Sequence, residues 1–198
     1  MVVMLEGQDS LNTELRYNKI YLSIIERYKD YIEQKENISV AELPTMITPK
    51  DPLVAKKAEE IKSGFAFYSY DLKFADAAAK TFNFVKDEIE GIVLPLQFWL
   101  TPGETISFAA GDEVDKNLLL CSLLLALGNA TAKVLMIIRD ESERRVFVHC
   151  EFLDKIYLFD IRDGIEQFDT LEEMIRYVDI GEDTTAYEFN DHAYYDIA

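Results

Sequence analysis

The chain has 198 residues, of which 49% are hydrophobic and 12% aromatic, and its 20 basic and 37 acidic residues give a net charge of −17. This composition is typical of a globular domain and excludes a disordered chain. The acidic charge repels nucleic-acid phosphates and anionic lipid, so we expect neither nucleic acid nor a membrane surface as a partner.

The N-terminal segment is expected to be a helical extension. Apolar residues recur at helical spacing from about residue 10 to residue 36, and they include Leu15, Leu22 and Ile25. We therefore divide the chain into an N-terminal extension, residues 1–46, and one compact domain, residues 47–198. The first residues, MVVMLEGQDS, lack the positive charge of a signal peptide. A cytoplasmic location is expected, and the oligomeric state stays open.

Two more helices are predicted before the middle of the chain. The second covers residues 47–62, with Asp51 as its N-cap and Pro52 at its first helical position. The third covers residues 71–89. A connection rich in Pro and Gly follows at residues 94–105, where we expect Trp99 to anchor the loop. Gln97 or Trp99 could be offered as an oxyanion donor, but the loop is too irregular to assign one.

The stretch GDEVDKNLLL, residues 111–120, is acidic at its start and apolar at its end. This pattern predicts the first turn of a buried helix that ends at Leu127, because Gly128 supplies a left-handed stop. Its apolar run, residues 118–127, is too short to span a bilayer. Neither Cys121 nor Cys150 belongs to a CxxC pair, so no zinc site or disulfide framework is expected.

After Gly128 the apolar period changes from helical to alternating. The predicted elements are strands 131–139, 144–153 and 155–161, a short helix 169–178 and a last strand 185–189. Helices that precede a run of strands predict an α+β fold, with an antiparallel sheet packed on the Leu-rich helix.

The turn between the second and third strands suggests a candidate pair of site residues. If Asp154-Lys155 forms a two-residue loop, His149 lies opposite Asp160 on one face of the sheet. A carboxylate beside an imidazole selects its tautomer and raises its basicity. The alternative is a half-buried histidine that any nearby acid satisfies. His192, in an acidic loop, is expected to be exposed to solvent.

The segment from about Ile47 to Gly164 resembles the transglutaminase-like superfamily, a branch of the papain-like cysteine-enzyme fold. The resemblance rests on DPLVAKKAEEI, FVKDEI, FWLTPGETI, GDEVDKNLLLCSLLLALGNATAK, FVHCEF and YLFDIRDG. It implies a papain-like core with a cysteine nucleophile, a histidine base and an aspartate that orients the histidine. On this chain the positions are Glu113, His149 and Asp160. Ile161-Arg162 departs from the Pro-Thr that follows the aspartate in the family.

The resemblance places a carboxylate where a thiolate should stand. A helix N-terminus favours either anion, but a carboxylate is a far weaker nucleophile towards amides. We therefore expect a catalytically inactive domain that serves as a protein-binding or scaffolding module, without a cofactor. The alternative is a hydrolase or transferase with altered chemistry, in which Glu113, His149 and Asp160 act by acid–base catalysis or hold a divalent metal. A purely structural subunit is the third possibility.

These interpretations share one geometric expectation. The Glu113 carboxylate should lie within reach of His149, and Asp160 should face the other ring nitrogen. A cysteine in place of Glu113 should then have a low thiol pKa that depends on His149.

Overall fold

The computed structural model describes residues 15–27, 40–93, 99–139, 143–181 and 184–197. The chain divides into two units, which are described separately. The smaller unit contains the helix 15–27 and residues 92–93, and the larger unit contains the described residues 40–91 and 99–197. Residues 40–46, which the sequence analysis assigns to the N-terminal extension, belong to the larger unit.

The helix of the smaller unit covers residues 15–27, and the rest of the predicted range 10–36 lies outside the described residues. The expected apolar stripe is not its buried face, since Leu15 and Leu22 are 52% and 57% exposed, whereas Ile24 is buried. The Tyr21 hydroxyl donates a hydrogen bond to the Val93 carbonyl at 3.2 Å.

The first helices of the larger unit begin where the sequence places caps. The elements are the 3₁₀-helix η1 (Val40–Met46), α2 (Pro52–Ser63), α3 (Tyr70–Asn83), the π-helical turn η2 (Phe84–Glu88) and α4 (Pro102–Phe108). The Asp51 side chain accepts hydrogen bonds from the first turn of α2, as predicted. Helix α4 was missed, although Thr101 and Glu104 form a capping box at its start. The predicted irregular connection 94–105 was therefore wrong from Thr101 onward.

Helix α5 (Glu113–Ala126) is the buried helix that the sequence predicts. Its residues from Val114 to Leu124 are all buried, because helices pack on one side of it and a sheet on the other. Gly128 follows with a φ of 107°, the left-handed conformation that glycine adopts without strain. Within the described residues, no helix combines the length and apolar character needed to cross a membrane.

Among the described residues the main sheet has six strands in the order β6-β5-β4-β3-β7-β8, and every neighbouring pair is antiparallel. The strands are β3 (Lys133–Ile138), β4 (Arg144–Phe152), β5 (Lys155–Asp160), β6 (Gly164–Phe168), β7 (Thr185–Phe189) and β8 (Tyr194–Asp196). The short strands β1 (Glu90–Gly91) and β2 (Ala110–Gly111) form a separate parallel pair. The predicted α+β class is confirmed, while β6 and β8 were missed.

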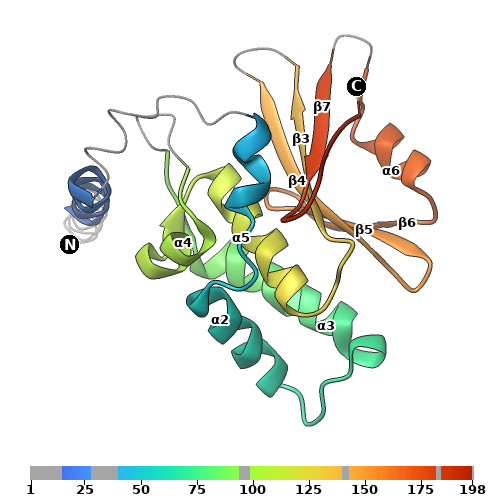
Figure 1. Ribbon diagram of the computed structural model, residues 1–198, viewed down its shortest axis with the longest axis horizontal. Helices are drawn as coiled ribbons and strands as arrows, with labels where there is room; N and C mark the ends of the chain where they lie inside the picture. The colour runs from blue at the N-terminus through green and yellow to red at the C-terminus, as the bar shows by residue number, and fades with distance from the viewer. Residues whose placement is uncertain (1–14, 28–39, 94–98, 140–142, 182–183, 198) are drawn as a thin grey trace, which may run out of the picture. The chain divides into compact units, whose positions relative to one another are not determined.

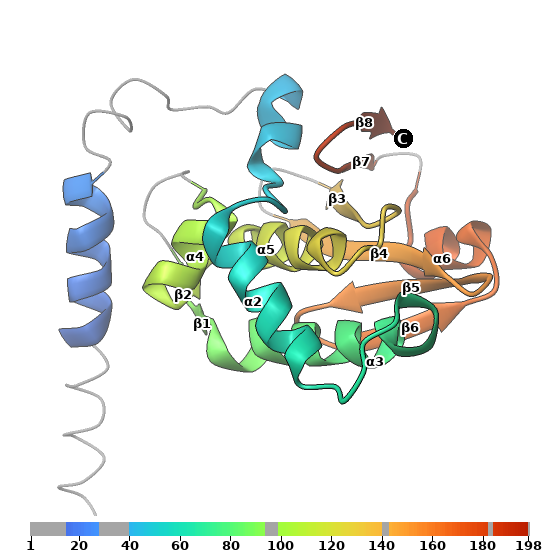
Figure 2. The same ribbon diagram turned by 60° about the horizontal axis from the view of Figure 1, so that its bottom comes forward.

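The two faces of the main sheet are covered differently. Figure 1 shows α2, α3, α4 and α5 gathered on one side of the sheet and α6 (Leu171–Tyr177) on the other. Figure 2 shows α5 lying along β4. Phe152 of β4 contacts Phe74 of α3, which assigns the even-numbered residues of β4 to the helical face. Phe147 belongs to the apolar cluster around Met174 of α6, which assigns the odd-numbered residues to the other face.

The turn between β4 and β5 differs from the prediction. Its two residues are Leu153 and Asp154, with φ of 50° and 57°, and not Asp154 and Lys155. Left-handed φ at both positions is the geometry of a type I′ hairpin, in which leucine is uncommon. His149 therefore lies opposite Leu158 and not opposite Asp160. The predicted register was wrong by two residues, so His149 and Asp160 share a face but are not directly opposed.

Candidate functional site

Glu113 is the first residue of α5, as the sequence predicts. The preceding residue, Asp112, caps the helix, because its Oδ1 accepts a hydrogen bond from the Asp115 N–H at 2.9 Å. Asp115 returns the contact and accepts from the Asp112 N–H at 2.9 Å. This capping box holds the backbone of Glu113 at the positive end of the helix dipole.

The Glu113 carboxylate pairs with a guanidinium. Its Oε2 accepts from Arg162, which follows β5, and its Oε1 is buried without a hydrogen-bond partner among the described residues. The hydrogen bond with Glu113 is the main reason that the pKa of Arg162 is raised. The expected contact between Glu113 and His149 is therefore not formed.

His149 lies on the sheet face opposite α5. It is 4% exposed, and its Nε2 lies 2.8 Å from Oε2 of Glu188 on β7. Lys133 of β3 pairs with the other oxygen of Glu188. Burial alone would raise the pKa of Glu188, but its hydrogen bonds with His149 and Lys133 outweigh burial and lower this pKa to about 2. The histidine therefore belongs to a hydrogen-bonded cluster of Lys133, His149 and Glu188, in which His149 and Glu188 are buried.

Asp160 contacts neither His149 nor Glu113. Its Oδ2 pairs with Arg145 of β4, and its Oδ1 accepts from the Arg162 N–H at 2.8 Å. Asp163 lies 3.4 Å from the same Arg145 guanidinium. Asp160 therefore fixes the backbone of Arg162, whose side chain pairs with Glu113. The three predicted site residues are divided between different ion pairs.

A second guanidinium acts on the N-terminal end of α5. Arg144 of β4 lies over the Trp99 ring, 5.8 Å from its centroid, and its charge offsets only part of the rise that burial causes in the pKa values of Asp112 and Asp115. Burial has the larger effect and raises both pKa values, most for Asp115, which also accepts from the Leu100 N–H at 2.7 Å. Trp99 thus lies beside the helix end, while Gln97 lies outside the described residues.

The groups around Glu113 are suited to binding charge and not to proton transfer. Arginine stays protonated at physiological pH and cannot act as a general base. Within the part of the chain that the structure describes, no three His, Cys, Asp or Glu residues lie together as a metal site, so the alternative ligand set Glu113, His149 and Asp160 is not assembled. Cys121 and Cys150 are buried, and burial raises the pKa of Cys150 to about 12.

Sequence reasoning missed the actual partners: Arg144, Arg145, Arg162 and Glu188. One signal was available for Arg162, because the chain departs from the family pattern at that position. For Glu188 the one signal was its charge, because it is a glutamate within the predicted apolar strand 185–189. Pairings between strands far apart in sequence depend on the order of strands in the sheet, which no local pattern encodes.

The low pKa of Glu188 predicts a specific loss of stability in acid. The folded value of about 2 lies below the ordinary value of 4.5. Ionised Glu188 therefore stabilises the fold fully above about pH 4.5, and this stabilisation falls as the pH drops towards 2. Urea unfolding of the wild type and of Glu188→Gln between pH 7 and pH 2 measures it. The stability difference between the two proteins should shrink below about pH 4.5, whereas a constant difference would contradict the assignment.

In this fold a buried helix presents its N-terminus beside an antiparallel sheet. Among solved structures the chain is similar to Legionella pneumophila LapG, with a TM-score of 0.51 and 15% identity over 81% of this chain and 88% of that one. EGTA-treated LapG from the same organism gives a TM-score of 0.51 and 14% identity over 81% and 87%. No protein-family model and no curated protein matches the chain. The similarity concerns the fold alone.

Proposed function

We propose that the chain is a catalytically inactive transglutaminase-like domain with a papain-like core, which acts as a protein-binding or scaffolding module. The observation that carries the proposal is the ion pair between Glu113, at the expected nucleophile position, and Arg162. A carboxylate neutralised by a guanidinium neither attacks an amide nor transfers a proton. The intact helix and sheet support a binding role for the fold.

The alternative with altered chemistry requires Glu113, His149 and Asp160 to converge on one substrate. Their contacts are instead with Arg162, Glu188 and Arg145, respectively. No contact among the described residues favours that alternative, so we do not pursue it.

The proposal is tested by amide turnover and by binding. Purified protein should hydrolyse neither denatured casein nor small peptide amides above the buffer rate, with or without added divalent cations. Glu113→Ala should give the same result. A partner that copurifies at fixed stoichiometry with both proteins would support a binding module. Turnover by the wild type that disappears in Glu113→Ala would overturn the proposal.

A further inference from the structure

The helix of the smaller unit, residues 15–27, carries apolar side chains on two opposite sides. One side is occupied within the chain, since Ile24 is buried and Tyr21 donates a hydrogen bond to a backbone carbonyl. Leu15 precedes Ile24 by nine residues, which is about two and a half helical turns, so the two side chains point in opposite directions. The side that carries Leu15 is therefore available to a partner outside the chain.

The exposed side of this helix follows the spacing of a coiled coil. Leu15, Leu22 and Ile25 are 52%, 57% and 40% exposed, and Asn18 among them is exposed as well. We call these four positions the seam. They are separated by three, four and three residues, which are the intervals between the a and d positions of a coiled-coil heptad. Side chains at these intervals form one line along a helix and pack between the side chains of a second helix that presents the same line.

Asn18 is suited to one kind of occupant of the seam. Its side-chain amide both donates and accepts hydrogen bonds, so an apolar surface against the seam would leave both groups unsatisfied. Asn18 of a second copy satisfies both groups at once when the two helices pair in parallel and in register. A single asparagine in the apolar contact of a coiled coil commonly fixes its register in this way.

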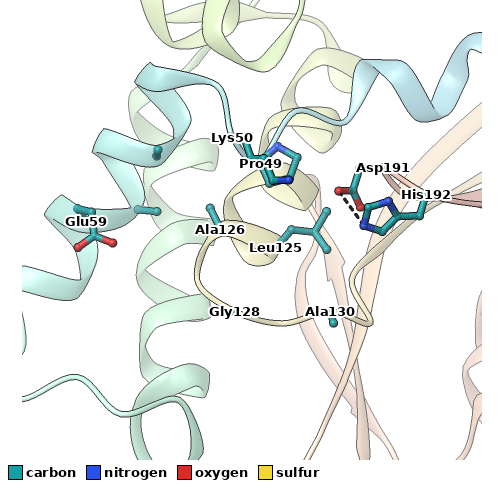
Figure 3. A pocket seen from close by; sticks show the side chains of 11 residues that line it. Pro49, Lys50, Glu59, Leu125, Ala126, Gly128, Ala130, Asp191 and His192 are labelled. Atoms are coloured by element: carbon teal, nitrogen blue, oxygen red, sulfur yellow. Dashed lines mark ion pairs between the residues drawn. The ribbon is translucent and has the colours of Figure 1, made fainter.

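The larger unit offers a competing surface for the seam of another copy. Figure 3 shows a pocket of about 580 Å³ between α2, the last turn of α5 and the loop before β8. Alanines line its apolar part, while its charged groups include Glu59, which pairs with Lys62 at 2.9 Å, and Asp191, which contacts His192 at 3.3 Å. His192 is exposed, as predicted. A helix seated in this pocket would lay Asn18 against a surface that does not repeat the seam, so the pocket is the less suitable receptor.

We propose that the chain self-associates through the seam, with the helix 15–27 of one copy packed in parallel against the same helix of a second copy. The contact covers the three apolar seam residues and places the two Asn18 amides opposite each other. It does not involve Glu113, so it is independent of the proposed function. Each copy carries a net charge of −17, and the resulting repulsion is screened by salt. Association through an apolar seam should therefore strengthen as salt is added, whereas a contact made of ion pairs would weaken.

Sedimentation equilibrium of the full chain at several salt concentrations tests the proposal. The molar mass of the wild type should rise above the 22.8 kDa of one chain as the protein concentration increases. Leu22→Glu keeps a good helix former but puts a charge in the seam, so it should weaken association at least about ten-fold. Asn18→Leu should tighten association about ten-fold, because it removes the polar group from the apolar contact.

Two variants and one mixture serve as controls. Ser23→Glu adds the same charge at an exposed neighbour outside the seam and should associate like the wild type. Ala130→Leu fills the pocket of the larger unit at an exposed position and should also associate like the wild type. Tagged Leu22→Glu should not capture the wild type, because both copies must contribute an intact seam. A helix that docked on any other surface of a second copy would still find that surface on Leu22→Glu.

The proposal is overturned if the wild type stays monomeric up to about 1 mM, the weak limit of specific binding. It is also overturned if Leu22→Glu and Ser23→Glu associate equally, if Asn18→Leu does not tighten association, if Ala130→Leu abolishes it, or if Leu22→Glu captures the wild type. Binding of the wild type but not of Leu22→Glu to anionic phospholipid vesicles, without self-association, would assign the seam to a membrane surface instead.

Discussion

Glu113→Cys should produce a thiol that reacts with iodoacetamide at pH 6 about ten-fold faster than an ordinary exposed cysteine. The new side chain would stand at the N-terminus of α5, where the dipole and the Arg162 guanidinium both lower a thiol pKa. The native Cys121 and Cys150 are buried and should stay unmodified in the folded protein. Mass spectrometry of the alkylated protein identifies the reacting residue.

The effects of Arg162 and His149 on the alkylation rate of Glu113→Cys distinguish the observed site from the one that the resemblance implies. Arg162→Gln in the Glu113→Cys background should slow alkylation several-fold, because the cation beside the sulfur is lost. His149→Gln in the same background should leave the rate unchanged, since His149 lies on the other face of the sheet. The rate should rise with pH through a single ionisation. A second ionisation near pH 6.5 that disappears in His149→Gln would show that the histidine does act on this position.

Glu188→Gln should destabilise the fold by about 3 kcal/mol at pH 7. Glu188 is 8% exposed and contacts two partners, Lys133 and His149, on the face of the sheet opposite α5. Removing one partner of a buried ion pair leaves uncompensated charge, which commonly costs about 3–5 kcal/mol. Chemical denaturation with urea measures the loss as a change in the unfolding midpoint at constant slope.

Glu166→Gln is the matched control for Glu188→Gln. Glu166 is an exposed residue of β6, so its substitution should change stability by no more than about 0.5 kcal/mol. Equal effects of the two substitutions would mean that the cluster of Lys133, His149 and Glu188 adds nothing beyond surface charge. A Lys133→Met variant should recover part of the loss in Glu188→Gln, because it removes the lysine charge that Glu188→Gln leaves without its carboxylate.

The hairpin between β4 and β5 shows how a local pattern misled the site prediction. Asp154-Lys155 is the more polar dipeptide and its composition predicts the loop there, but the turn places Leu153 and Asp154 in the left-handed region. Leucine pays a steric cost there that only the pairing of the whole strands can offset. A shift of two residues in register kept His149 and Asp160 on one face and still separated them.

The elements that can be predicted from the sequence are those whose causes are local. The capped starts of α2 and α5, the stop at Gly128 and the alternating strands follow from side chains within a few residues of each other, and so does the α+β class. The sequence also predicts that Glu113 begins a buried helix. Only the tertiary structure decided which charges meet, because Arg162 and Glu113 lie 49 residues apart, and Glu188 and His149 lie 39 apart. Such pairings depend on strand order, on register and on which sheet face each strand presents to α5, and these emerge only when the whole core packs.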